Sequence, residues 1–239
     1  MLAVALLLPL VDGPVVPGSA LSAEAQWAAV LACPRVSVTG RAVTEGTGVV
    51  VGAKDGFAYL LTAAHVVPYD GVTVQFTTRQ EYPKWNRRTA EDTEVVERWP
   101  DADLALLRFR VPERQVVWFR IRDPQAVSQL PLAGPGQRPK SFPFPAWTVG
   151  LTGGEMTVRV DRVGSKQAIR PADRGLTFYW ETDHPPERGR SGGPLLDGHG
   201  RVIGLCEAAR GSHGYYTHLD EILAALKRGG HGWLVTPKP

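Results

Sequence analysis

Cysteine is scarce in this sequence of 239 residues, which contains only Cys33 and Cys206. Two thiols cannot build a disulfide framework, so an apolar core must hold the chain together. The pair could form one bridge, which would restrict the unfolded chain, or remain as two small buried thiols. Because Cys206 lies in an apolar stretch, burial of two free thiols is the favoured interpretation.

Long apolar runs and a strong charge of one sign are also missing. The run at residues 2–11 is too short to cross a bilayer. The 27 basic and 24 acidic residues are interspersed, and the formal net charge is +3. We therefore expect neither an integral membrane span nor a nucleic-acid partner. Arg87 and Arg88, near Tyr82 and Trp85, are interpreted as part of an exposed loop.

Metal-ligand spacing is a further absence. Most histidines have no cysteine or acidic partner at a spacing typical of metal ligands, so we expect no metal and no cofactor. They are interpreted as surface or loop residues. These histidines are His184, His199, His213, His218 and His231.

An export signal is the predicted role of residues 1–25. The apolar run at residues 2–11 has the length of a signal's hydrophobic region, although no basic residue precedes it. Ala23-Glu24-Ala25 offers a cleavage pattern, and residues 18–20 offer another. Either would place the mature protein in the periplasm or outside the cell.

Short strands dominate what is present. The sequence has 26 glycines and 20 prolines, which suit many turns and few long helices. Runs of β-branched or alternating apolar residues fall into two groups of six, so we predict an all-β fold of two six-stranded antiparallel β-barrels. The first group is 36–39, 48–51, 58–62, 72–76, 94–98 and 104–108, and the second is 146–151, 156–163, 176–182, 193–196, 202–207 and 215–217.

The proline-rich stretch at residues 131–145 separates these groups, because it can form neither a helix nor a central strand. We therefore assign residues 26–135 to the first barrel and residues 136–239 to the second. A short helix is predicted at residues 26–32. A C-terminal helix is predicted at residues 220–229, where acids come first, bases last and glycine ends the pattern.

Three segments carry candidate chemistry. Residues 189–194 read Gly-Arg-Ser-Gly-Gly-Pro, which can present the Ser191 hydroxyl on a tight turn. A hydroxyl needs a base to take its proton, and His65 follows an apolar strand. The imidazole in turn needs a carboxylate, which Asp103 supplies just before another apolar run.

Each of these residues has another possible role. His65 could be a core histidine and Ser191 an ordinary turn serine. Asp101 lies two residues before Asp103 and could be the acid in its place. The abrupt start of apolar residues after Asp103 favours Asp103.

The three segments together resemble those of the trypsin-like (chymotrypsin-fold) serine proteases, where TAAH, D-[IL]-A-L-L and G-x-S-G-G-P segments carry a catalytic triad. Residues 46–51, 181–184 and 202–205 resemble the bacterial HtrA-like (Deg-type) branch. The resemblance covers residues 36–228. The sequence ends at Pro239, with no segment for the PDZ domain that many HtrA-like proteases carry.

This resemblance implies a mechanism. Ser191 would attack a peptide carbonyl, His65 would accept its proton and Asp103 would orient His65. The backbone N–H groups of Gly189 and Ser191 would form the oxyanion hole. Arg190 stands between these two donors, where these families often have Asp or Asn. This departure from the pattern leaves the orientation of the two N–H groups open.

The substrate pocket is expected near Pro185, Arg190, Glu207 and Ala208. Pro185 lies six residues before the serine, where a trypsin-type pocket for basic side chains keeps an Asp, so a basic preference is disfavoured. The HtrA-like resemblance implies a small or medium aliphatic side chain instead. A carboxylate of Glu207 that pointed inward would favour a cation, although an acid near a strand end more commonly faces solvent.

The predicted function is that of a serine endopeptidase acting on exported or unfolded polypeptides. The alternative is a catalytically impaired scaffold that serves as a binding or sensing module, which Arg190 keeps open. A monomer and a trimer fit the sequence equally well.

Overall fold

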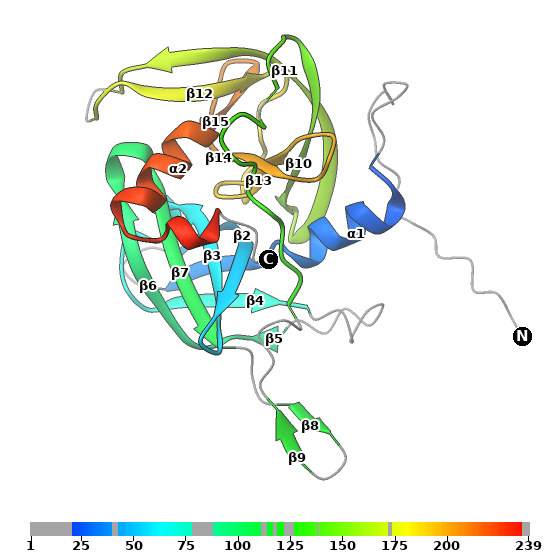
Figure 1. Cartoon of the computed structure of the whole chain (residues 1–239), viewed down its shortest axis with the longest axis vertical. Coiled ribbons are helices and arrows are strands. Elements are labelled where there is room, and N and C mark those ends of the chain that lie inside the picture. Colours follow the sequence, from blue (N-terminus) through cyan, green and yellow to red (C-terminus); the bar gives the residue numbers. More distant parts are fainter. Residues whose placement is uncertain are drawn as a thin grey trace, which may run out of the picture.

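Two β-structures packed side by side make up the fold, with one helix near each end (Figure 1). The computed structural model describes residues 21–39, 43–77, 88–110, 114–116, 119–121, 127–137, 139–171 and 174–235. The apolar run at residues 2–11 and Tyr82, Trp85 and Arg87 of the predicted exposed loop lie outside these ranges. Arg88, expected in the same loop, is half-buried and pairs with Phe76 in a strand instead.

Seven antiparallel strands form the first sheet, in the order β5-β4-β1-β2-β3-β7-β6. The edge strands β5 and β6 are separated along the chain by Ala90 alone, and its N–H donates to the Val74 carbonyl of β4 at 2.8 Å. The sheet therefore curls back on itself. Its strands are β1 (Arg35–Thr39), β2 (Val43–Lys54), β3 (Phe57–Ala63), β4 (Val72–Phe76), β5 (Arg88–Thr89), β6 (Glu91–Trp99) and β7 (Leu104–Arg110).

The second sheet closes completely as a six-stranded barrel in the order β10-β11-β12-β15-β14-β13. Every neighbouring pair is antiparallel. Its strands are β10 (Phe144–Thr152), β11 (Glu155–Ile169), β12 (Thr177–Thr182), β13 (Pro194–Leu196), β14 (Val202–Arg210) and β15 (His213–His218). The predicted all-β fold of two barrels is confirmed. The second barrel is closed and has the predicted six strands, whereas the first is a curled sheet of seven strands instead of six.

Strands β3 and β7 are buried on both faces, which explains why they read as continuous apolar runs instead of alternating ones. Leu60 and Leu107 point into the interior of the first sheet. Leu61 and Leu106 pack in another cluster that also contains Trp147 of the second barrel and Ile222 of the C-terminal helix. The ends of β3 and β7 are thus fixed by packing against both halves of the molecule.

Several elements differ from the predicted strands. β2 is longer than the predicted residues 48–51, and β5 was not predicted. β11 continues past residue 163 to Ile169, because its polar second half still pairs with β12 from Ser165 to Ile169. A separate hairpin of β8 (Arg114–Val116) and β9 (Phe119–Ile121) was not predicted. As far as the structure describes residues 131–145, they contain no strand before Phe144, and a bridge between Leu132 and Val202 ties them to the second barrel.

The C-terminal helix α2 (Leu219–Arg228) lies one residue earlier than expected and ends at Gly229. It begins early because the His218 ring accepts a hydrogen bond from the Asp220 N–H at 3.0 Å, as an N-cap side chain does. Its apolar face packs through Ile222 into the core cluster that also contains Leu61 and Trp147.

The N-terminal helix α1 (Ala23–Leu31) also starts earlier than predicted. The Ser22 hydroxyl accepts a hydrogen bond from the Ala25 N–H at 3.2 Å, and Leu21 is part of the buried core. Cleavage after Ala25 would remove this cap and the first helical turn, whereas cleavage after Ala20 would leave them intact. Neither α-helix in the described chain has the length and apolar character needed to span a bilayer.

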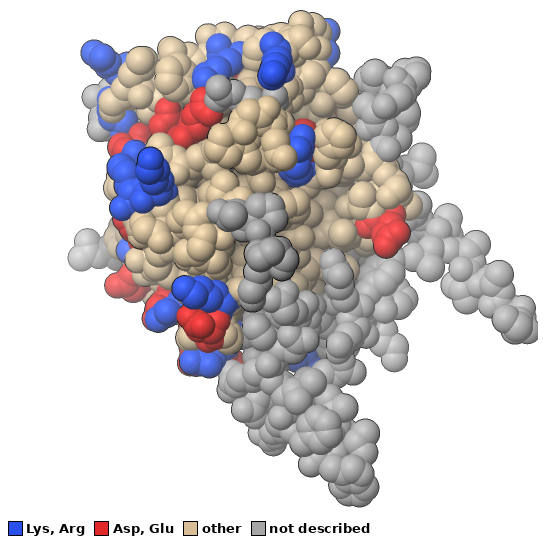
Figure 2. Space-filling model, in the orientation of Figure 1, with Lys and Arg blue, Asp and Glu red and all other residues tan. Residues whose placement is uncertain are grey.

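Both cysteines are free and buried, so the interpretation as two buried thiols is confirmed. Cys33 and Cys206 belong to different core clusters. Burial raises the pKa of Cys206 to about 12 and also raises that of Cys33, which keeps both groups as unreactive thiols. On the surface, Figure 2 shows acidic and basic side chains interspersed over the viewed face.

Candidate active site

His65 and Asp103 meet because the strands that carry them are paired. Ala63 at the end of β3 lies opposite Leu104 at the start of β7. His65 lies in a 3-10 turn, η1 (Ala64–Val66), that follows β3, and Asp103 caps another, η2 (Pro100–Ala102), before β7. Asp103 has φ of +50°, a left-handed conformation that Asp tolerates better than most residues.

Two hydrogen bonds join these residues. Nδ1 of His65 lies 2.6 Å from Oδ2 of Asp103, and the His65 backbone N–H donates to Oδ1 at 2.9 Å. The carboxylate side chain is 7% exposed and the imidazole 48% exposed. The ring is therefore held at Nδ1, and its other nitrogen remains accessible.

The hydrogen bond that the His65 ring donates to the Asp103 carboxylate is also the main reason that the pKa of His65 is raised. Burial lowers this pKa, the charges of Asp103 and Glu207 raise it, and the charge of Arg174 lowers it. Asp101 takes no part in this pair, because its carboxylate accepts a hydrogen bond from Arg228 at 2.9 Å on the surface.

Ser191 lies in a double turn between β12 and β13. The Arg190 N–H donates to the Glu187 carbonyl at 3.2 Å, and the Gly193 N–H donates to the Arg190 carbonyl at 2.9 Å. Gly189 and Gly192 have φ values of +93° and +80°, which only glycine adopts readily. The serine is thus held between two residues that let the chain turn sharply.

Two backbone donors in this turn are free. To the extent that the structure describes possible acceptors, the N–H groups of Gly189 and Ser191 donate no hydrogen bond, although those of Arg190, Gly192 and Gly193 all do. Unpartnered neighbouring N–H groups can receive an anion. These are the two donors expected for an oxyanion hole.

The serine turn comes from the second barrel and the His–Asp pair from the first, and they meet at Gly46 of β2. A Cβ built on Gly46 would lie 2.7 Å from both the Ser191 carbonyl oxygen and the Val66 side chain. Within the described residues, neither the Ser191 hydroxyl nor Nε2 of His65 has a hydrogen-bond partner. Such catalytic contacts often tighten only when substrate binds.

A comparison of sequence decides the family. The model of the Trypsin-like peptidase domain matches residues 46–205, a span that contains all three candidate residues. The chain belongs to the trypsin-like peptidase family. A search of curated protein sequences found no match.

Solved structures share the fold of this trypsin-like peptidase at low sequence identity. The inactive Ser-to-Ala mutant of Rv3671c from M. tuberculosis H37Rv has a TM-score of 0.67 and 20% identity, covering 92% of this chain and 97% of that one. Deg5 has a TM-score of 0.63 and 19% identity, and the match covers 84% of this chain and 90% of Deg5. The HtrA-type protease AlgW with tripeptide has a TM-score of 0.62 and 20% identity, and the match covers 87% of this chain and 64% of AlgW.

Arg190 in this trypsin-like peptidase points into the second barrel and is 1% exposed, so it does not line an open pocket as expected. Its Nη1 donates to Thr157 Oγ1 at 2.8 Å, Thr152 Oγ1 at 3.2 Å and the Gly150 carbonyl at 3.3 Å. Its Nη2 donates to Thr148 Oγ1 at 2.7 Å. Burial lowers the pKa of Arg190, and no carboxylate of the described residues forms an ion pair with it.

Replacing Arg190 with methionine should reduce the free energy of unfolding by about 2 kcal/mol, because buried threonine hydroxyls lose their donors. Urea unfolding measures this change. Arg170→Met is the matched control, because Arg170 is exposed, and it should change stability by less than about 0.5 kcal/mol. Equal stability of the two variants would show that the barrel interior does not depend on the guanidinium.

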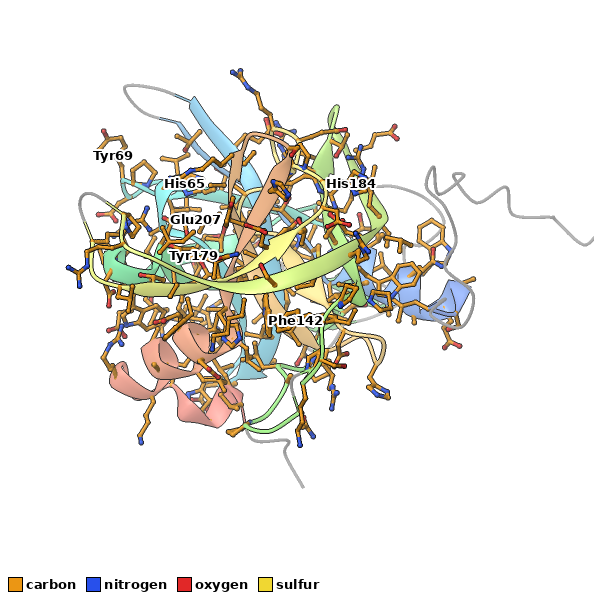
Figure 3. The ribbon with its side chains drawn as sticks, turned by 90° about the horizontal axis from the view of Figure 1, so that it is seen from above. His65, Tyr69, Phe142, Tyr179, His184 and Glu207 are labelled. Carbon is orange, nitrogen blue, oxygen red and sulfur yellow. The ribbon has the colours of Figure 1, made fainter. Side chains whose placement is uncertain are left out.

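Glu207 points inward, contrary to the commoner orientation of an acid near a strand end. It lies at a bulge where β14 slips against β15 between Cys206 and Ala208, and a bulge can redirect a side chain. Figure 3 shows Glu207 between His65 and Tyr179. Ala208 and Pro185, the other expected pocket residues, are exposed.

The Glu207 carboxylate is 10% exposed and has two charged or polar partners. Arg174 approaches Oε1 at 3.0 Å, and the Thr217 hydroxyl donates to Oε2 at 3.2 Å. Burial is the main cause that raises the pKa of Glu207, and the charge of Asp103 adds to it. A second carboxylate, balanced by Arg174, therefore stands beside the His–Asp pair. Arg174 was not identified from the sequence as a partner of Glu207, because it lies in no recognisable sequence motif.

Two of the remaining histidines have partners of their own outside the His–Asp pair. His218 is fully buried, against the expectation of a surface or loop residue, because its ring packs on Trp180 and caps α2. His184 is exposed and its Nδ1 lies 3.0 Å from Asp161. No group of three His, Cys, Asp or Glu side chains suited to a metal occurs in the described ranges.

Proposed function

We propose that this trypsin-like peptidase is a serine endopeptidase. Ser191 Oγ attacks the carbonyl carbon of a peptide bond while Nε2 of His65 takes the hydroxyl proton, and Asp103 stabilises the resulting imidazolium. The 2.6 Å contact between His65 and Asp103, beside a turn with two unpartnered N–H groups, is the observation that supports this mechanism best.

The remaining steps follow from the same residues. The tetrahedral oxyanion accepts hydrogen bonds from the Gly189 and Ser191 N–H groups. When the C–N bond breaks, His65 returns the proton to the leaving amine and Ser191 keeps the acyl group. Water, deprotonated by His65, then releases the acid and restores the hydroxyl.

Polypeptides in extended conformation are the proposed substrates. Cleavage needs a segment that can reach the seam between the barrels, which an unfolded chain offers most readily. The structure of AlgW, which shares this fold, was solved with a tripeptide. We further propose that the enzyme acts outside the cytoplasm, on the basis of residues 1–25 of the sequence.

Fluorophosphonate labelling of the purified protein tests the proposal. The wild-type protein should acquire one label at Ser191, and Ser191→Ala should acquire none. Mass spectrometry of tryptic peptides locates the label. A correctly folded wild-type protein that stays unlabelled and leaves casein intact would favour the scaffold that binds or senses without cleaving.

The pH dependence of kcat/KM tests the surroundings of His65. The imidazole must be neutral to act as a base, so activity falls as the pH drops through its pKa. Glu207→Gln removes a negative charge that raises this pKa, and it should move the acid limb to lower pH. Arg174→Gln should move it to higher pH.

Glu181→Gln serves as the control for this pair. Its carboxylate accepts a hydrogen bond from Tyr215 at 2.9 Å and does not contribute to the pKa of His65. Its pH profile should match that of the wild type. Shifts of Glu207→Gln and Arg174→Gln in the same direction would contradict the electrostatic explanation.

A further inference from the structure

Thr47 of β2 contacts the serine turn from the opposite barrel. Its backbone N–H donates to the Ser191 carbonyl at 2.8 Å, and its hydroxyl donates to the Gly189 carbonyl at 2.8 Å. The same hydroxyl accepts a hydrogen bond from the Leu151 N–H of β10 at 2.9 Å. One fully buried threonine thus joins three points of the second barrel to the first.

These contacts fall on the two residues whose N–H groups are free. Thr47 holds the carbonyls of Gly189 and Ser191, which belong to the two peptide units on either side of the one that carries the free Ser191 N–H. A turn that contains glycines at 189, 192 and 193 has little conformational preference of its own. The orientation of its peptide planes therefore depends on what holds it from outside.

The region around Thr47 is packed too tightly for water to take over this role. A Cβ on Gly192 would overlap the Thr62 hydroxyl and the Thr47 carbonyl, and one on Gly46 would press on the Ser191 carbonyl. The Thr62 hydroxyl donates to the Thr47 carbonyl at 2.7 Å and holds Thr47 in place.

We propose that Thr47 is a positioning residue that locks the serine turn across the seam between the barrels, with its two free N–H groups set to receive the oxyanion. The proposal rests on the endopeptidase mechanism given above. Thr47 touches no reacting atom and acts through the peptide units of Gly189 and Ser191.

Thr47→Val and Thr47→Ser separate the hydroxyl from the rest of the side chain. Valine keeps the shape and the backbone hydrogen bond to the Ser191 carbonyl, but it loses the hydroxyl's bonds to the Gly189 carbonyl and the Leu151 N–H. The kcat for a peptide substrate should therefore fall about tenfold or more while KM changes less than about threefold. Serine keeps the hydroxyl and should stay within about threefold of the wild-type kcat. Thr182→Val is the control, because Thr182 is equally buried and its hydroxyl donates to the His184 carbonyl at 3.1 Å.

Hydrogen exchange of the peptide that covers residues 187–193 gives a readout that needs no activity. Thr47→Val should speed exchange at the bonded Arg190 amide, which shares a peptide unit with the Gly189 carbonyl, by about tenfold, and Thr47→Ser and Thr182→Val should not. Thermal unfolding of each variant confirms that it is folded.

The outcomes are distinct. Unlabelled wild-type protein would defeat the endopeptidase proposal, and the exchange data would then still test whether Thr47 holds the turn. Unchanged kcat and exchange in Thr47→Val would overturn the positioning role. A serine variant as impaired as the valine variant would assign the effect to the methyl group and overturn it as well.

Discussion

Replacing Ser191 with alanine is expected to lower kcat for peptide hydrolysis by about a million-fold. The nucleophile is lost outright, and only substrate binding and the two N–H donors remain to assist attack by water. The turn itself should persist, because neither its backbone hydrogen bonds nor the bond from the Thr47 hydroxyl to Gly189 uses the Ser191 hydroxyl. Cleavage of a fluorogenic peptide, followed to high enzyme concentration, measures the loss.

Ser212→Ala is the matched control for this experiment. Its hydroxyl lies 3.2 Å from the Nδ1 of His213, but the pair is exposed. It should retain the wild-type kcat. Retained hydrolysis in Ser191→Ala, in a preparation shown by mass spectrometry to be free of other proteases, would rule out Ser191 as the nucleophile.

Replacing Asp103 with asparagine is expected to lower kcat by about 10⁴-fold near neutral pH. The side-chain amide would donate to Nδ1 of His65, so the ring would carry its proton on Nε2 and could not take one from Ser191. Asparagine also tolerates the left-handed conformation that Asp103 adopts, so the change should alter the chemistry more than the fold.

Asp101→Asn is the control, and it should retain nearly full activity because Asp101 is exposed and pairs with Arg228. The kcat of the two variants is compared at several pH values. If Asp101→Asn lost the activity and Asp103→Asn kept it, the assignment of the acid would have to be reversed.

The fold was readable from the sequence because its strands carry local signals. The apolar runs at β3 and β7 and the glycine turn at residues 189–193 mark where the strands end and where the chain turns. The paired ends of β3 and β7 then bring His65 and Asp103 together. The local sequence pattern and the pairing of these strands were therefore enough to predict that His65 and Asp103 are neighbours.

Side-chain direction at the site could not be read in this way. Arg190 turns into the barrel because three threonines of β10 and β11 converge on its guanidinium, which only the closed barrel brings about. Glu207 turns inward because of a bulge between β14 and β15. Both depend on contacts between distant parts of the chain, and neither leaves a periodic signal.

The buried thiols bear on where this protein can fold. Cys33 and Cys206 lie out of solvent in separate core clusters, and neither is cross-linked. The native state therefore requires no disulfide between them and offers no accessible cysteine thiol to peroxide or glutathione. The same fold should form equally well under reducing and oxidising conditions.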